Sequence, residues 1–275
     1  MRRLILFLPL LLFINCKQQP ATPTGLVTEK AMVVSAREEA SQLAADIMKK
    51  GGNAFDAMVA TELSLVIAYP FAGSVGGGGF MVYRKSNGEV GGIDYREKAP
   101  LAAHKDMYLD SLGNVIPGLS TSGGTAVGVP GTVAGVLEVH RKFGKLPLKE
   151  IIEPIIALAN KGVVVTEKQA ERLAGYREDF IKANSDSTKF AGPFTAGDTI
   201  KYPTYAKTLQ KIMEEGRDGF YKGEVAQKLA DFVQENGGLI TTEDLEKYEA
   251  VWRDPIVFNY KDIKVISMSP PSSGG

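Results

Sequence analysis

The side chains that most often carry out catalysis are scarce in this sequence. It has two histidines, His104 and His140, and a single cysteine, Cys16, among 275 residues. Neither histidine belongs to a metal-binding pattern such as H-E-x-x-H, so we expect no metal site in the chain. Serines and glycines gather at residues 120–124 without forming a G-x-S-x-G motif, and two isolated histidines leave a Ser-His-Asp triad few ways to form. The composition therefore argues against zinc enzymes and triad hydrolases.

A run of four glycines at residues 76–79 is the second candidate for chemistry. Backbone amides exposed by glycine can hold a phosphate group. A phosphate loop needs a lysine and a hydroxyl after its glycines, but Phe80 stands there, and the run leads into an expected strand rather than a helix. We therefore interpret the run as a place where backbone segments pack closely, not as a nucleotide site.

Arg96 is the third candidate, because it lies just past the end of an expected strand, in Asp94-Tyr95-Arg96-Glu97. A guanidinium can donate two parallel hydrogen bonds to a carboxylate, which suits it to binding a carboxylate substrate. It can equally form an ordinary salt bridge with Asp94, Glu97 or a distant acid. The neighbouring residues leave both interpretations open.

Apolar periodicity, caps and turns predict the elements that would position these residues. We expect a helix that begins after Ser35, with Glu38 completing a capping box, and a helix at 54–68 capped by Asn53. The second helix is apolar on nearly all faces, which indicates burial in a large core. The expected strands lie at 31–34, 80–83, 90–95, 255–260 and 263–268. The other expected helices lie at about 131–143, 148–159, 166–183, 203–215, 222–236 and just after Thr241. This order of sheet, helices and sheet predicts one α+β body.

The first residues have the pattern of an export signal. A basic start is followed by an apolar stretch of about eleven residues, which is too short to span a bilayer, so we expect residues 1–15 to be a signal peptide. Cys16 ends that stretch and is a candidate for lipidation, with residues 16–27 as a polar tether. The alternative is an ordinary signal peptide with an incidental cysteine. With 32 basic and 32 acidic residues the chain has no net charge, so we expect no nucleic-acid partner.

Taken together, seven segments of the chain resemble the gamma-glutamyltransferase family, whose members are also called gamma-glutamyltranspeptidases or glutathione hydrolases. The likeness runs from about residue 31 to the last residue and keeps the family's order. The segments that carry it are residues 51–57, 76–80, 94–100, 129–135, 220–223, 237–245 and 270–275. One such motif would be weak, whereas the ordered set is specific.

The resemblance implies the fold of an N-terminal-nucleophile hydrolase, an αββα sandwich, of which this chain would hold an incomplete part. It implies a precursor that cuts itself into a large and a small subunit. A threonine at the start of the small subunit then attacks γ-glutamyl amides such as glutathione, with its own amine as the base and with no cofactor. Arg96 matches the family's arginine that binds the substrate α-carboxylate.

The resemblance also implies that the nucleophilic threonine and its pocket lie beyond residue 275. Residues 28–275 would then be a partial gamma-glutamyltransferase domain, inactive alone, in an exported protein that is periplasmic or an outer-membrane lipoprotein of a bacterium. Two alternatives remain open. One is a non-catalytic surface lipoprotein that keeps the fold as a binding module. The other is a related acylase that acts on cephalosporins or poly-γ-glutamate.

Overall fold

The computed structural model describes residues 25–184 and 188–274. The chain divides into two units at Met32, and all helices and strands of the described residues belong to the second unit, which begins at Val33. The predicted signal peptide and Cys16 lie outside the described residues. The last residues of the predicted tether, 25–27, are exposed and form neither helix nor strand.

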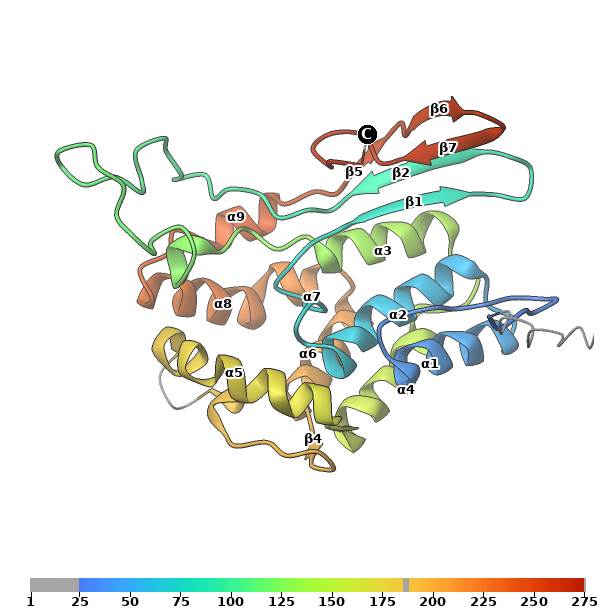
Figure 1. The fold of residues 1–275 in the computed structure, drawn as a ribbon, viewed down its shortest axis with the longest axis horizontal. Coiled ribbons are helices and arrows are strands. Elements are labelled where there is room, and N and C mark those ends of the chain that lie inside the picture. Colours follow the sequence, from blue (N-terminus) through green and yellow to red (C-terminus); the bar gives the residue numbers. More distant parts are fainter. Residues whose placement is uncertain (1–24, 185–187, 275) are drawn as a thin grey trace, which may run out of the picture. The chain divides into compact units, whose positions relative to one another are not determined.

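A three-stranded antiparallel sheet positions Arg96. Its order is β1 (Phe80–Arg84), β2 (Val90–Asp94) and β5 (Val251–Arg253), so the central strand is the one that ends just before Arg96. The predicted hairpin between the first two strands is confirmed, and Gly88 in its turn has a φ of +88° that favours glycine. The third strand comes from far along the sequence and lies beside β2 (Figure 1). It pairs Trp252 with Ile93.

The second hairpin, β6 (Ile256–Tyr260) and β7 (Ile263–Ser267), was also predicted and is confirmed. Met268 follows it directly and is buried. A Cβ atom on Gly92 would lie 2.9 Å from the Met268 sulfur, so the residue after β7 packs closely against β2. Figure 1 shows this hairpin beside the three-stranded sheet.

Helices α2 (Ala54–Ala68) and α3 (Thr132–Phe143) cover one face of the sheet (Figure 1). The layer between these helices and the sheet contains the buried side chains of Ile93, Tyr95 and Val139, which pack against Phe55 and Met58. The prediction of a buried α2 is confirmed. So is its cap, because the Asn53 side chain accepts hydrogen bonds from the first turn while Asp56 accepts one from the Asn53 amide.

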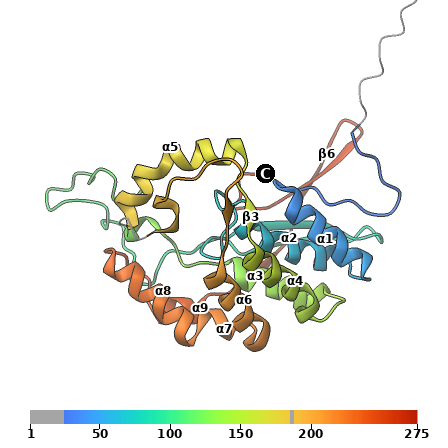
Figure 2. The same ribbon diagram turned by 90° about the horizontal axis from the view of Figure 1, so that it is seen from below.

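The remaining helices pack with α2 and α3 around the main core (Figures 1 and 2). They are α1 (Glu38–Lys49), α4 (Leu148–Lys161), α5 (Glu167–Asn184), α6 (Pro203–Glu215), α7 (Asp218–Tyr221), α8 (Gly223–Glu235) and α9 (Thr242–Lys247). All except α7 were predicted, and the Thr241–Asp244 capping box of α9 is confirmed. Three strands were not predicted: β5 of the three-stranded sheet, and β3 (Val163–Val164) and β4 (Thr199–Ile200), which pair with each other.

Two expectations near the start of this unit are wrong. Residues 31–34 form no strand, because no described segment pairs with them, and Val34 is 82% exposed. Ser35 is not the cap of α1, whose N-cap is Arg37 without a capping side-chain bond. The Ser35 hydroxyl instead accepts a hydrogen bond from the Arg37 amide at 3.3 Å and lies 2.8 Å from the Ser41 hydroxyl, so it does not bond to the amides of the first turn.

None of the helices among the described residues combines the length and the apolar character needed to cross a membrane.

Candidate functional site

The backbone at Arg96 is fixed first by the residue that ends β2. Asp94 is 8% exposed, and one of its carboxylate oxygens accepts a hydrogen bond from the Arg96 amide at 3.0 Å. Its other oxygen accepts one from the Arg253 Nε at 2.8 Å. Asp94 therefore has an ion-pair partner on the neighbouring strand β5 and supports Arg96 only through the main chain.

A buried tyrosine fixes the other side of Arg96. The Tyr248 hydroxyl donates a hydrogen bond to the Arg96 carbonyl oxygen at 2.7 Å, and the tyrosine is only 2% exposed. Burial raises the pKa of Tyr248, so its hydroxyl keeps its proton and remains a donor. Its ring stacks on that of Tyr221 at 5.9 Å, and the Tyr221 hydroxyl donates to the Pro130 carbonyl at 2.9 Å.

Arg217 holds this pair of tyrosines in place. Its guanidinium lies 4.5 Å from the centre of the Tyr221 ring, and its Nη2 donates to the carbonyl oxygens of Glu246 at 2.9 Å and Tyr248 at 2.5 Å. The same contact fixes the end of α9, from which Tyr248 follows. No local pattern indicated this role, because Arg217 lies in a short turn far from Arg96 in the chain.

The side chain of Arg96 itself is free. Arg96 is exposed, and its guanidinium has neither a hydrogen bond nor an ion pair with any residue that the structure describes. Neither neighbouring acid forms a salt bridge with Arg96. Asp94 pairs with Arg253, and Glu97 forms no ion pair within the described ranges. A rigid backbone that presents an unpaired guanidinium is suited to binding an anion with good geometry.

The glycine run packs against the backbone that carries Arg96. A Cβ atom on Gly78 would lie 2.5 Å from the Tyr95 carbonyl oxygen and 2.8 Å from the Arg96 Cα. The Gly77 carbonyl accepts hydrogen bonds from Gly131 at 2.8 Å and Thr132 at 3.1 Å, so it occupies the amides at the start of α3 that an anion would otherwise use. These contacts agree with the interpretation of the run as close packing.

The other candidates from the sequence are the histidines and the serine- and glycine-rich segment at residues 120–124. His140 contacts the Leu146 carbonyl oxygen through Nε2 at 2.8 Å. Residues 120–123 are exposed in a loop, with neither histidine near them in the sequence. Within residues 25–184 and 188–274, no three His, Cys, Asp or Glu side chains come close enough to hold a metal ion. A pocket of about 80 Å³ beside Tyr248 is lined by Lys98, Val129 and Asp244 among others, but not by Arg96.

The sequence model described as gamma-glutamyltranspeptidase matches residues 40–275. The chain belongs to this enzyme family. It is 43% identical to a glutathione hydrolase proenzyme of Escherichia coli (strain K12) over 90% of this chain and 43% of that protein. It is 40% identical to the glutathione hydrolase proenzyme of Bacillus subtilis (strain 168), again over 90% of this chain and 43% of that protein. The chain thus spans about half the length of the curated relatives it matches.

Solved structures of the family agree with this assignment. The gamma-glutamyltranspeptidase of Helicobacter pylori superposes with a TM-score of 0.87 at 43% identity, over 90% of this chain and 72% of that one. The transpeptidase CapD of Bacillus anthracis gives 0.74 at 29% identity, over 90% and 78%. A cephalosporin acylase of Bacillus halodurans, at 24% identity, shares the fold. The predicted α+β fold of the N-terminal-nucleophile hydrolases is confirmed, with a helical layer on a sheet present here.

Proposed function

We propose that this chain forms the N-terminal part of an enzyme that hydrolyses glutathione and other γ-glutamyl amides or transfers the γ-glutamyl group to amino acids and peptides. The observation that carries the proposal is the exposed, unpaired Arg96 guanidinium on a backbone held by Asp94 and Tyr248. The family match and the names of the relatives support the reaction class.

In this proposal Arg96 binds the α-carboxylate of the γ-glutamyl donor through two parallel hydrogen bonds. Because the Arg96 amide and carbonyl are both bonded to buried groups, the backbone that carries the guanidinium is fixed relative to the sheet. The bound α-carboxylate then fixes one end of the γ-glutamyl group. A fixed position of this kind lowers the entropic part of the barrier.

The nucleophile in this proposal is the hydroxyl of an N-terminal threonine on a small subunit, outside these 275 residues. Its hydroxyl proton passes to its own α-amine as the oxygen attacks the γ-carbonyl carbon. The donor's amine takes that proton and leaves, and a γ-glutamyl ester remains on the threonine. Water or the amine of an acceptor then cleaves the ester and restores the hydroxyl.

We propose further that the protein is exported, with residues 1–15 as its signal peptide, and that Cys16 is acylated and anchors it to a bacterial membrane. The support is the sequence pattern alone, a short apolar stretch that ends at the one cysteine. Mass spectrometry of the protein from membranes tests this. A diacylated Cys16 at the mature N-terminus supports the anchor, and an unmodified Cys16 contradicts it.

The experiment that tests the enzymatic proposal uses the protein with any natural continuation beyond residue 275 retained. Purified protein is incubated with glutathione, a cephalosporin with an acyl side chain, or poly-γ-glutamate, and the released amines are measured. We expect glutamate and cysteinylglycine from glutathione, with less product from the other two. Cleavage of a cephalosporin or of poly-γ-glutamate alone would favour the acylase alternative, and no cleavage with glutamate binding retained would favour the binding module.

A further inference from the structure

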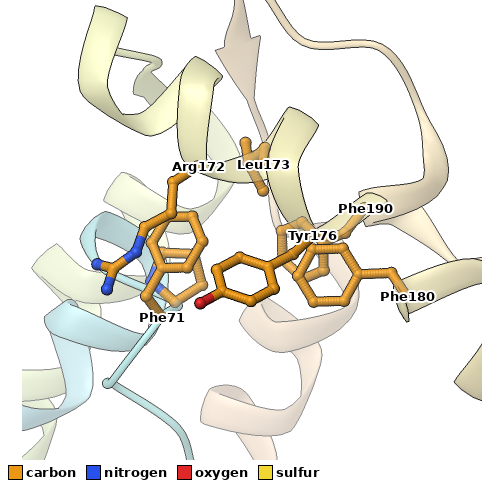
Figure 3. Close-up of a pocket in the computed structure, with 7 residues that line it drawn as sticks. Phe71, Arg172, Leu173, Tyr176, Phe180 and Phe190 are labelled. Atoms are coloured by element: carbon orange, nitrogen blue, oxygen red, sulfur yellow. The ribbon is translucent and has the colours of Figure 1, made fainter. Parts of the chain in front are cut away.

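Two adjoining pockets lie between helix α5 and the segment that follows α2. The first has a volume of about 300 Å³ and is mostly aromatic, with Tyr176, Phe180 and Phe190 in its wall (Figure 3). The second has a volume of about 340 Å³ and has the basic residues Arg37 and Lys168 in its wall. Phe71 and Arg172 line both, so we treat the two as one site and call it the α5 groove. None of its residues contributes to the surroundings of Arg96.

The aromatic half of the groove can receive an apolar group. The ring of Phe180 lies 5.7 Å from that of Phe190 and 6.4 Å from that of Tyr176. Figure 3 shows the Tyr176 ring between Phe71 and Phe180, and Tyr176 is 50% exposed. An apolar ligand that covers this half-exposed aromatic wall removes apolar surface from water, which favours binding.

The half of the groove that contains Lys168 and Arg172 is positively charged, and neither cation pairs with an acid among the described residues. The Arg172 guanidinium lies 4.7 Å from the centre of the Phe71 ring and donates a hydrogen bond to the Tyr69 hydroxyl at 2.9 Å. Neither Arg172 nor Lys168 forms an ion pair within the part of the chain that the structure describes. They lie four residues apart on α5, where like charges repel each other unless an anion lies between them.

Arg37, at the start of α1, lines the groove as a cation that is paired with Glu39. Two of its nitrogens donate to the Glu39 carboxylate, at 2.6 and 3.0 Å, and its side chain is only 12% exposed. Its third nitrogen, Nη1, is shielded from water and has no hydrogen-bond partner among the described residues. Glu39 therefore balances the charge of Arg37, and Nη1 is left as a donor that can still bond to a ligand in the groove.

We propose that the α5 groove binds a small carboxylate that bears an aromatic or branched apolar group. The carboxylate lies against Arg172 and Lys168, and the apolar group packs on Tyr176 and Phe180. Of the described residues that line the groove, none is acidic, and the nearby Glu39 carboxylate is paired with Arg37. Stacking on Phe71 leaves the edge of the Arg172 guanidinium able to donate, and that edge matches a planar carboxylate.

The test compares ligands that differ by one property at a time. Saturation-transfer NMR and calorimetry measure binding of 3-phenylpropionate, its neutral amide, acetate and phenyl phosphate to the protein with any natural continuation retained. We expect 3-phenylpropionate to bind with a Kd on the order of 0.1–1 mM, because the groove is open and the ligand small. The amide, which lacks the charge, and acetate, which lacks the ring, should bind at least about tenfold more weakly.

Variants locate the binding. Arg172→Gln should weaken 3-phenylpropionate by about tenfold or more, since it removes a charged hydrogen-bond donor. Lys182→Gln is the matched control, an exposed cation on the same helix outside the groove, and should leave the Kd unchanged. Tyr176→Ala should weaken the acid and the amide alike. Circular dichroism verifies that each variant is folded.

Three results would overturn the proposal. The first is equal binding of acid and amide, and the second is an Arg172→Gln variant with the Kd of the Lys182→Gln control. The third is no binding of 3-phenylpropionate at about 10 mM, ten times the upper end of the expected Kd range. Phenyl phosphate that binds more than about tenfold tighter than the carboxylate would overturn the choice of carboxylate in favour of a phosphate ester.

Discussion

The Tyr248 hydroxyl donates a hydrogen bond to the Arg96 carbonyl oxygen across 2.7 Å, although 152 residues separate the two in the sequence. This bond ties the residue after α9 to the residue that follows Tyr95 at the end of β2. Tyr248 in turn stacks on Tyr221, and Arg217 holds both. The position of the exposed Arg96 side chain therefore depends on the helical layer as well as on the sheet.

Replacing Tyr248 by phenylalanine removes that hydrogen bond and keeps the stacked ring. We expect the free energy of unfolding to fall by about 1 kcal/mol, the usual net value of one such bond. In the full-length protein KM for γ-glutamyl donors should rise by about threefold with little change in kcat, because the bond positions a binding group. Urea unfolding and initial rates measure both. Tyr260→Phe, at a 60% exposed tyrosine in β6, is the control and should change neither.

Replacing Arg96 itself tests its proposed contact with the α-carboxylate. Arg96→Ala should raise KM for γ-glutamyl donors by about 10- to 100-fold, the range for loss of a charged hydrogen-bonded pair. Arg96→Lys should recover only part of the loss, because an ammonium keeps the charge without the two-pronged geometry. Arg84→Ala, at an exposed arginine that ends β1, is the control. An unchanged KM in Arg96→Ala would remove this residue from the donor site.

Local sequence signals predicted the parts of the site that depend on neighbours in the chain. The capping box at Asn53, the turn at Gly88 and the place of Arg96 after a strand all follow from residues within a few positions of each other. Patterns of apolar residues also gave most helices, because each buries one face against a common core.

The rest of the site rests on contacts between distant segments, which no local pattern contains. Pairing of β5 with β2 joins residues about 160 positions apart, as in the bond from Arg253 to Asp94. Arg217 and Tyr248 stood in the sequence as an ordinary turn residue and an ordinary aromatic. The predicted strand at residues 31–34 failed for the same reason, since a strand exists only if some other segment pairs with it.

The close packing at Gly131 predicts a sharp difference between two glycine substitutions. A Cβ atom there would lie 1.9 Å from the Tyr95 carbonyl oxygen and 2.1 Å from the Tyr248 hydroxyl, so Gly131→Ala should destabilise the protein by about 3 kcal/mol or more. Gly175→Ala is the control. It places the same methyl group in α5 with no atom within 4 Å and should stabilise by about 0.5–1 kcal/mol. Thermal and urea unfolding of both variants measure the difference.

The half-buried ion pair between Asp94 and Arg253, across β2 and β5, gives a double-mutant prediction. Asp94→Asn weakens the bonds to Arg253 and to the Arg96 amide, and we expect a loss of about 1–3 kcal/mol in the free energy of unfolding. Arg253→Gln alone should cost less, because Asp94 keeps the amide bond. The coupling energy of the pair should be about 1–2 kcal/mol. Additive effects of the two substitutions would show that the ion pair contributes no stability.

Glu62 on α2 predicts a specific dependence of stability on pH. Burial raises the pKa of its carboxyl above 4.5, and no ion pair compensates it among the described residues. A raised pKa in the folded state means that folding favours the protonated acid. Its contribution is therefore fully present below pH 4.5 and is lost as pH rises through the folded-state pKa.

Glu62→Gln, which stays neutral, should gain stability relative to the parent protein between pH 4 and pH 8. Glu178→Gln, at an exposed glutamate in the interior of α5, makes the same change of charge and should show no such gain in urea unfolding at the two pH values. An equal response of the two variants would mean that Glu62 is as well solvated in the folded protein as Glu178.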